Sequence, residues 1–260
     1  MNKELTAIIT IAFRDLTKLM RDKFRIAANF VFPLIFIGVL GTSLQSNLQE
    51  NLQYNFLTFV FTGVVAQTLF QSTAAGLISL IEDRQNDFAQ ELFISPISRY
   101  SIIIGKILGE TMVAFVQITG VLIFGLFFNV PLDILTLVKL IPIGILIAFF
   151  GGAFGVIVMA NFSDQRTANQ IFPFLLFPQF FLAGVFNPIK VLPTPILILS
   201  RIAPLTYAVD LLRSMYYAGK PEAAHAVLYP VWLNLTIVGV FLILFLVAGT
   251  LLFVKKEKNR

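Results

Sequence analysis

Residues 231–254 read VWLNLTIVGVFLILFLVAGTLLFV, a stretch that contains no charged side chain. A helix needs about 20 apolar residues to cross the hydrocarbon core of a bilayer, and this stretch is long enough. An open sheet is excluded there, because its edges would leave backbone N–H and C=O groups unsatisfied in hydrocarbon. The stretch therefore predicts a transmembrane helix.

Five further apolar runs precede it, at residues 26–44, 56–81, 111–130, 139–160 and 171–186. The run at 171–186 is the shortest and contains Pro173 and Pro178, so we expect a bent helix there. The sequence thus predicts an all-α integral membrane protein with six transmembrane helices, formed by one transmembrane domain over residues 1–260. Within the fourth run, Gly151 and Gly155 form a G-x-x-x-G pattern that predicts close helix packing.

The composition agrees with a membrane protein and excludes most catalytic sites. Charged residues make up 13% of the chain, against about 25% in soluble domains. The absence of Cys excludes disulfides and thiolate zinc sites, and one histidine, His225, cannot supply a multi-histidine metal site. No G-x-x-x-x-G-K-[ST], G-x-S-x-G or H-E-x-x-H motif occurs, so we predict no catalytic residue, metal or bound cofactor, and no ATP hydrolysis by this chain.

The distribution of Lys and Arg predicts the orientation in the membrane. If all six runs cross it, 14 of the 19 basic residues fall on the side that holds both termini. Because cytoplasmic loops carry the excess of Lys and Arg, we expect both termini in the cytoplasm and the protein in the cell (inner, cytoplasmic) membrane. The net charge of +5 then reflects topology. No nucleic-acid partner is expected, because the positive charge is dispersed along one membrane face.

Residues 1–25 are too polar for a signal peptide and predict an amphipathic helix. Its apolar residues recur at helical spacing, whereas Lys3, Arg14, Lys18 and Arg21 lie off that stripe. Such a helix lies in the cytoplasmic interface with its basic side toward anionic headgroups, so membrane lipid is an expected partner. A passive anchor is the favoured role, and a lever that moves the first span is the alternative.

Residues 187–230 form a long connection on the predicted outer side. Residues 189–200 are apolar, but they are too few to cross the bilayer and are interrupted by Pro193 and Pro195. Apolar runs of this length are typical of re-entrant or interfacial segments. We therefore expect short re-entrant helices that enter the outer leaflet before the last span.

Glu110 is the main ionisable residue near the inner edge of a predicted span. It lies one helical turn after Lys106, so the favoured interpretation is an interfacial ion pair between these two residues. The alternative is a proton-relay carboxylate. A relay would be expected to include a second buried carboxylate or a histidine, and the sequence does not suggest one.

The segment EDRQNDFAQELFISPISRYSIIIGK, residues 82–106, is the most informative cytoplasmic stretch. Pro96 ends a helix there, because proline disfavours the helical conformation of the residue before it. A short helix over about residues 83–94 would present charged side chains to the cytoplasm as a docking surface, and an ordinary polar loop is the alternative. The charged residues are Glu82, Arg84, Asp87 and Glu91.

At this segment the chain resembles the ABC-2 type permease family, the membrane subunits of ATP-binding-cassette exporters. The first match comprises Glu82, Arg84, Glu91-Leu92, Ser95-Pro96-Ile97-Ser98-Arg99 and Gly105-Lys106. The second comprises Pro204-Leu205-Thr206-Tyr207-Ala208-Val209-Asp210 and the following Arg213. Chain length, the N-terminal helix, six spans and the long loop before the last span extend the resemblance over nearly the whole chain. The family often has Gly where this chain has Asn86-Asp87, which affects where the docking helix begins.

The resemblance implies that two permease copies, identical or related, form the translocation path. It also implies two separate ATPase subunits, which hold ATP and Mg and dock on the cytoplasmic helix between spans two and three. Closure of the ATPases would move that helix together with spans one, two and five. The residues expected to couple to the ATPase are Glu82, Arg84, Asp87, Glu91, Ser95, Pro96 and Arg99.

Two other classes of function remain open at this point. An ion-coupled secondary transporter would be expected to show paired midplane carboxylates or inverted repeats, and neither is visible. A membrane scaffold or assembly protein would need no ATPase. Phe174, Phe177 and Phe181 are candidates for lining a path for hydrophobic or amphipathic compounds, and lipid-facing phenylalanines are an equally good interpretation.

Overall fold

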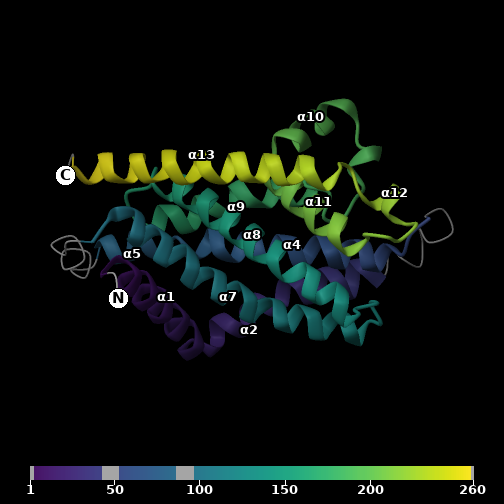
Figure 1. The fold of residues 1–260 in the computed structure, drawn as a ribbon, viewed down its shortest axis with the longest axis horizontal. Helices are drawn as coiled ribbons and strands as arrows, with labels where there is room; N and C mark the ends of the chain where they lie inside the picture. Colours follow the sequence, from purple (N-terminus) through teal and green to yellow (C-terminus); the bar gives the residue numbers. More distant parts are fainter. Residues whose placement is uncertain (1–2, 43–52, 86–96, 259–260) are drawn as a thin grey trace.

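The computed structural model describes residues 3–42, 53–85 and 97–258, and the regular structure in these ranges is entirely helical. The elements are α1 (Lys3–Arg21), α2 (Lys23–Leu34), the π-helix η1 (Ile35–Gly41), α4 (Phe56–Gly76), α5 (Ser79–Gln85), α7 (Arg99–Phe127), α8 (Ile134–Met159), α9 (Gln165–Leu182), the 3-10 helix η3 (Ile189–Val191), α10 (Thr194–Ile202), α11 (Pro204–Tyr216), α12 (Ala223–Ala226) and α13 (Val231–Lys258). The predicted all-α class is confirmed. In Figure 1 the two ends of the chain lie toward the same end of the bundle.

Four helical segments are long and apolar enough to cross a membrane: Phe56–Asp83, Arg99–Phe127, Ile134–Met159 and Ala223–Lys255. The pair α10 and α11, bent by 84°, adds a fifth only if it is counted as one span. Among the described residues the structure therefore supports four or five candidate spans, and the count of six remains a prediction.

The two remaining apolar runs form helices that are interrupted or short. The run at 26–44 becomes α2, which contains Pro33, and continues as the π-helix η1. The end of this run enters residues 43–52, which lie outside the described part. The run at 171–186 becomes α9, an 18-residue helix that contains both Pro173 and Pro178. Neither helix reaches the length and hydropathy of the other four.

Helix α7 begins 12 residues before the apolar run at 111–130 that predicted it. The charged side chains of Lys106 and Glu110 lower the hydropathy of its first half, but both are buried. The hydropathy pattern therefore placed the start of this helix too late.

Aspartates fix the starts of the next two helices. Asp133 precedes α8 and accepts a hydrogen bond from the backbone N–H of Thr136, and Asp164 precedes α9 and accepts one from Thr167. Such N-caps satisfy backbone donors that have no partner within the helix. The backbone bond from Thr167 lowers the pKa of the Asp164 carboxyl below its ordinary value, since it stabilises the charged form.

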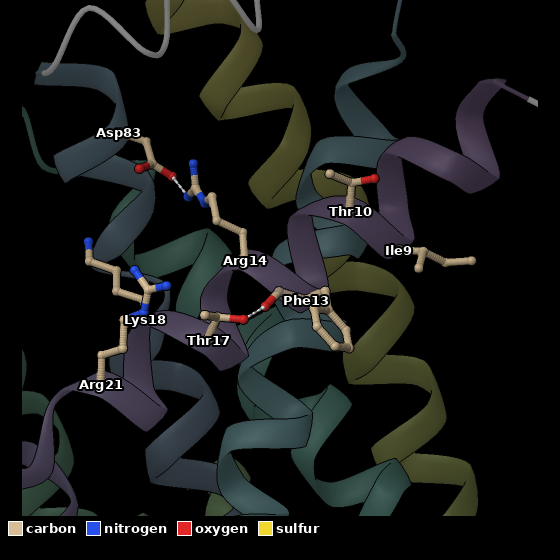
Figure 2. A pocket seen from close by; sticks show the side chains of 8 residues that line it. All are labelled: Ile9, Thr10, Phe13, Arg14, Thr17, Lys18, Arg21 and Asp83. Atoms are coloured by element: carbon tan, nitrogen blue, oxygen red, sulfur yellow. Dashed lines mark hydrogen bonds and ion pairs between the residues drawn. The ribbon is translucent and has the colours of Figure 1, made fainter.

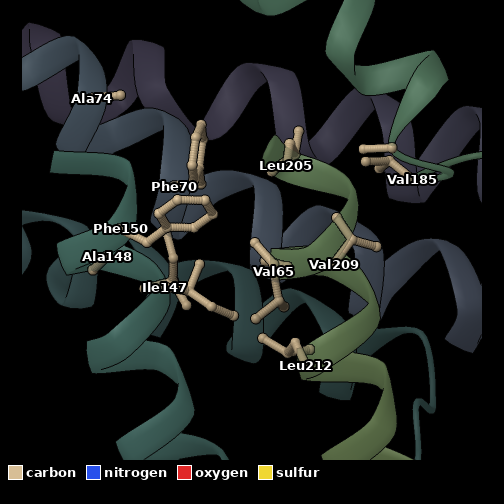
Figure 3. Close-up of a cluster of buried hydrophobic side chains, with 14 of the residues drawn as sticks. Val65, Phe70, Ala74, Ile147, Ala148, Phe150, Val185, Leu205, Val209 and Leu212 are labelled. Atoms are coloured by element: carbon tan, nitrogen blue, oxygen red, sulfur yellow. The ribbon is translucent and has the colours of Figure 1, made fainter. Parts of the chain in front are cut away.

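Helix α4 lies at the centre of the packing and contacts α7, α8 and α11. Every residue from Phe56 to Gln67 is buried, so this helix has no solvent-facing stripe in its first half. Figure 3 shows Phe70 of α4 facing Phe150 of α8, and their ring centroids are 5.3 Å apart in an edge-on arrangement. Val209 and Leu212 of α11 close the same cluster.

The predicted close packing of the G-x-x-x-G pattern is confirmed. A Cβ atom on Gly151 would meet the backbone of Phe70, and one on Gly155 would lie 2.7 Å from the carbonyl oxygen of Ala74. Helices α8 and α4 are therefore in contact through their backbones, without side chains between them.

Helix α1 packs along α7, and its apolar stripe is divided between two environments. Ile11, Ala12 and Leu19 are buried. The exposed apolar residues form a separate edge, made of Leu5, Ile9, Phe13 and Met20. The predicted amphipathic helix is thus present as a helix, and its location at a membrane interface remains a prediction.

We expect Gly151→Leu to lower the stability of the fold severely. Overpacking alone costs about 1–3 kcal/mol, and here the new side chain would meet backbone atoms that cannot move aside. The apparent melting temperature of the purified protein in detergent should fall by several degrees or the folded yield should collapse. Gly239→Leu is the matched control, because no atom lies within 4 Å of a Cβ at Gly239. Equal melting temperatures of the two variants would contradict the packing described here.

Candidate functional site

Lys106 of α7 is, with Asp210, one of the two most deeply buried charged residues of the described chain, and 1% of its surface is exposed. Its ammonium lies 3.2 Å from a carboxylate oxygen of Asp15 on α1 and also pairs with Asp83 on α5. The hydroxyl of Ser79, at the start of α5, lies 3.1 Å away. One cation therefore joins three helices that are distant in sequence.

Arg14 completes the cluster from the next position on α1. Its guanidinium lies 2.6 Å from an oxygen of Asp83 and 3.1 Å from one of Asp15, and Figure 2 shows the contact with Asp83. We call Arg14, Asp15, Asp83 and Lys106 the ionic cluster. Its two cations and two carboxylates balance each other, which matters because a buried charge is tolerated only when it is paired and hydrogen-bonded.

Two glycines of α7 allow α1 to come close enough for these pairs to form. A Cβ atom on Gly105 would lie 3.1 Å from the carbonyl oxygen of Ile8, and one on Gly109 would lie 3.0 Å from the Cα atom of Ala12. These distances leave no room for a larger residue. The two glycines that contact the backbone of α1 therefore lie on either side of Lys106 on the same helix.

Lys106 forms the longer-range ion pairs of the ionic cluster, and its predicted pair with Glu110 stays a prediction. Glu110 is also buried, and its carboxylate occupies the space where a side chain at Gly76 of α4 would be. Gly76 therefore allows α4 and α7 to approach around this carboxylate. Lys106 and Glu110 are both buried among helices, so this position is more enclosed than the interfacial site that the sequence predicts.

Glu82 is the first of the predicted coupling residues, and it contacts α1. Its carboxylate lies 3.0 Å from the ammonium of Lys18, and both side chains are partly exposed. Arg99 is the first residue of α7, directly after the cap Ser98. Asp87, Glu91, Ser95 and Pro96 lie outside the described residues, as does the side chain of Arg84. The predicted docking helix is therefore described only at its two flanks.

A groove of about 770 Å³ follows α1 beside the ionic cluster. Figure 2 shows its apolar and polar parts, formed by Ile9, Phe13, Thr10, Thr17, Arg14, Lys18 and Arg21 of α1 with Asp83. The hydroxyls of Thr10 and Thr17 are bonded to the carbonyl oxygens of Thr6 and Phe13 within the helix. Both faces of this part of α1, toward the bundle and toward the groove, therefore carry charge.

The predicted outer motif forms α11 and its junction with α10. Thr206 donates to the carbonyl oxygen of Ser200 at 2.7 Å, and Tyr207 donates to that of Arg201 at 2.7 Å. These bonds hold the bend between the two helices. Pro204 is the first residue of α11, where its missing N–H costs nothing, and Leu205 is fully buried.

Arg213 is buried between α11, α4 and the end of α9. Its guanidinium donates to the carbonyl oxygens of Phe59 and Val185 at 3.0 and 3.2 Å, and lies 3.5 Å from the centroid of the Phe59 ring. Gly63 provides the space, since a Cβ there would lie 2.9 Å from the guanidinium. Arg213 therefore fixes α11 to α4 through backbone acceptors.

Asp210 fixes α11 to the start of α13. Its carboxylate accepts hydrogen bonds from the backbone N–H groups of Leu228 and Tyr229, at 2.7 and 2.9 Å, and from the side-chain amide of Asn234 at 2.7 Å. The structure thus gives Asp210 and Arg213, which lie one helical turn apart on α11, positioning roles toward two different neighbouring helices.

The three predicted path-lining phenylalanines share one exposed face of α9. Phe174, Phe177 and Phe181 are exposed to between 46% and 79%. The ring of Phe181 lies 5.5 Å from that of Phe177 and 6.0 Å from that of Phe186, which stacks on Phe36 of η1 at 4.4 Å. Aromatic contacts thus connect α9 with η1, and what covers the exposed face stays open.

Asp15 and Asp83 were not predicted as partners of Lys106. Asp15 was the available signal, since it lies between Ala12 and Leu19 on the stripe that was predicted to be apolar. A charge on such a stripe indicates a buried partner, but nothing in the spacing identifies which residue it is. Among the described residues no group of His, Cys, Asp and Glu could hold a metal ion.

Comparison with known proteins identifies one family whose profile covers both the ionic cluster and the outer motif. The profile of the ABC-2 type transporter family matches residues 6–217. A Cyanophora paradoxa protein named as a transport permease, ycf38, is 22% identical over 217 residues, which cover 80% of this chain and 73% of that protein. ABC transporter G family member 20 of Dictyostelium discoideum is 26% identical over 207 residues, which cover 78% of this chain and 28% of that protein. The chain thus spans little more than a quarter of the second relative.

We expect Lys106→Met to destabilise the protein strongly. Removing one partner of a buried ion pair costs about 3–5 kcal/mol, because the carboxylates left behind carry an unbalanced charge. Thermal unfolding in detergent measures the loss, and Lys139→Met, at an exposed position of α8, serves as the control. Adding Asp15→Asn restores the charge balance with Arg14 and Asp83 and should recover part of the loss. A variant Lys106→Met as stable as Lys139→Met would show that the cluster contributes nothing.

Proposed function

Because the chain belongs to the ABC-2 type transporter family, we propose that it is the membrane-spanning subunit of an ATP-binding-cassette exporter. In this proposal two copies form the translocation path and separate ATPase subunits drive it. The observation that carries the proposal is the family match over residues 6–217, which includes the ionic cluster and the outer motif. The long apolar helices support the same conclusion, since they make the chain a membrane protein.

ATP and Mg belong to the partner subunit in this proposal. The chain contains no phosphate-binding loop of the G-x-x-x-x-G-K-[ST] type. The ATPase docks on the connection between α5 and α7, where the coupling residues are Glu82, Arg84, Asp87, Glu91, Ser95, Pro96 and Arg99. Glu82 directly precedes Asp83 of the ionic cluster, and Arg99 begins the helix that carries Lys106, so a force applied to the connection meets three helices that are already joined.

The proposed orientation places this end of the bundle in the cytoplasm of a cell membrane. Both chain ends lie toward it in Figure 1, as an even number of crossings requires. The exposed edge of α1, with Leu5, Ile9 and Phe13, then enters the inner leaflet, and the basic residues of the helix approach anionic headgroups. Membrane lipid is thus a partner of α1.

The proposed substrates are hydrophobic or amphipathic compounds. The exposed phenylalanine face of α9 supports this choice, because aromatic side chains bury large apolar areas and offer few polar contacts. Its connection to η1 through Phe181, Phe186 and Phe36 places α9, with its two prolines, next to the π-helix that follows Pro33 of α2. The path then lies between α9, η1 and the second copy.

Cysteine labelling tests the orientation, and the chain has no native Cys. We expect His225→Cys, at an exposed position of α12, to react with a membrane-impermeant maleimide in intact cells. Ser163→Cys, exposed between α8 and α9, should react only after permeabilisation. In the six-span prediction α9 crosses the membrane between Ser163 and His225, so the two positions lie on opposite sides. Labelling of Ser163→Cys from outside would overturn the orientation.

Charge removal in the connection tests docking. We expect Asp87→Ala with Glu91→Ala to insert normally but to lose the co-purifying ATPase, because truncating one member of a desolvated charge pair costs about 2–5 kcal/mol. Glu82 is left in place, since its pair with Lys18 belongs to α1. Glu257→Ala in the C-terminal tail is the control. Unchanged ATPase recovery and transport in the double variant would leave the connection as an ordinary loop.

A further inference from the structure

We propose that a pocket enclosed by α4, α7, α8 and α11 binds one acyl chain of a phospholipid from the surrounding bilayer. The pocket has a volume of about 170 Å³, and its lining shares no residue with the ionic cluster or with the phenylalanine face of α9. The inference needs only a membrane location, which the long apolar helices support. It does not depend on an ATPase partner, so it stands or falls separately from the proposed function.

The floor of the pocket lies in the tightly packed centre of the bundle. Val65 and Leu69 of α4 and Leu212 of α11 line it, and each is at most 5% exposed. Figure 3 shows Val65 and Leu212 within the buried hydrophobic cluster. A molecule that touches Leu212 has therefore entered between the helices, because contact with the outer surface of the bundle does not reach this residue.

The walls of the pocket come from α7 and α8, and the pocket opens on the outer face of these two helices. Phe115 and Leu122 of α7 and Leu140 of α8 are partly exposed along its sides, and Ile141 is 50% exposed. Both helices are long and apolar enough to cross a membrane. The opening therefore faces the hydrocarbon of the bilayer.

The chemistry of the lining excludes water and polar ligands. Among the described residues that line the pocket none is charged, and the polar side chain of Thr119 is satisfied within its own helix. Its hydroxyl donates to the carbonyl oxygen of Phe115 at 3.0 Å. A buried water makes about two to four hydrogen bonds, and this lining does not offer them. The pocket therefore favours a ligand without polar atoms.

The size of the pocket fits a segment of an alkyl chain. An apolar cavity of about 150 Å³ lined by Leu, Ile and Phe stays free of water and binds benzene or xenon. This pocket, of about 170 Å³, has the same kind of lining and holds about six carbon atoms by that comparison. Because protein interiors are close-packed, an empty space of this size would lose contacts along all of its walls. The bilayer supplies alkyl chains directly at the opening.

The depth of the pocket matches the acyl chains of one leaflet. Its α8 residues run from Leu137 to Gly144, three to ten residues after Ile134, the first residue of the helix. At 1.5 Å per residue this range lies about 5–15 Å along the helix. Half of the hydrocarbon core is about 15 Å thick. The chain therefore comes from a lipid in the leaflet next to the turn between α7 and α8.

Gly144 lies where α8 approaches both neighbouring walls. A Cβ atom there would lie 3.3 Å from side-chain atoms of Leu69 and of Phe115, so a larger residue would narrow the space between α4 and α7. A chain in the pocket contacts α7 on one side and the packed helices α4, α8 and α11 on the other. Binding of the chain thus stabilises the position of α7 against these three helices.

Photolabelling of the native chain tests the site in vesicles of phosphatidylethanolamine and phosphatidylglycerol. A small fraction of the phosphatidylethanolamine carries a diazirine in the middle of one acyl chain, and mass spectrometry identifies the labelled residues. We expect label on Leu212 or Leu69 in addition to exposed residues such as Ile123 and Ile145. Label confined to the exposed residues would show only the lipid that surrounds the bundle and would overturn the proposal.

A second probe distinguishes a phospholipid chain from a free fatty acid. The same vesicles without the reactive phospholipid receive a fatty acid that carries the diazirine at the same place in its chain. Label on Leu212 from the phospholipid supports the proposal. Label on Leu212 from the fatty acid alone would assign the pocket to a free acid and overturn it.

Filling the pocket tests its position. Leu122→Trp places a larger side chain in the pocket, and Ile123→Trp is the matched control, because Ile123 is 58% exposed and does not line the pocket. Label on Leu212 should fall about tenfold in Leu122→Trp, the change that a loss of about 1.4 kcal/mol in chain binding produces. The control should keep it. Equal labelling of Leu212 in the two variants would contradict the site.

Thermal unfolding gives an independent readout in detergent. Added phosphatidylethanolamine should raise the apparent melting temperature of the native chain and of Ile123→Trp, because a ligand that binds the folded state stabilises it. The rise should be smaller in Leu122→Trp. An equal rise in all three proteins would place the stabilising lipid elsewhere and overturn the proposal. The labelling of the native chain decides the matter even if Leu122→Trp does not fold.

Discussion

The ammonium of Lys106 is buried within the helix bundle, where a cation without a counter-charge would cost more free energy than most single interactions supply. Asp15 and Asp83 bring the counter-charge from two other helices, and Arg14 balances the second carboxylate. The arrangement of α1, α5 and α7 follows from this requirement. The glycines at 105 and 109 make it possible, because they allow α1 to approach the helix that carries the charge.

The two ends of the molecule hold their helices together by different means. Around Lys106, charged side chains from distant parts of the chain neutralise one another. Around α11, Arg213 and Asp210 bind mainly backbone groups, so each charge is compensated by dipoles of the main chain. A bond to the backbone depends little on the identity of the partner residue. The first end is therefore sensitive to sequence changes in three helices, and the second mainly to the geometry of the bend.

The extent to which this fold could be predicted follows from where its charges lie. The helix at 231–258 was predicted closely, because no charge interrupts its apolar run. The start of α7 was predicted too late, because hydropathy cannot recognise that Lys106 is neutralised by a residue 91 positions earlier. For the same reason Asp15 was not identified as part of a site. Asp210 and Arg213 were found only through resemblance to a family, since no local pattern distinguishes a buried positioning charge from a solvated one.

The backbone contact between α4 and α8 limits how the bundle can deform. Interfaces lined by side chains can absorb small displacements by rotamer changes, but at Gly151 and Gly155 there is nothing to rearrange. These two helices therefore behave as one stiff unit, with α11 attached to it by Arg213. Any change of shape must be concentrated elsewhere. The elements that can still deform are those whose backbone hydrogen bonding is interrupted. These are η1, which follows Pro33, and α9, which contains two prolines. The stacked rings of Phe36 in η1 and Phe186 after α9 bring the two elements into contact.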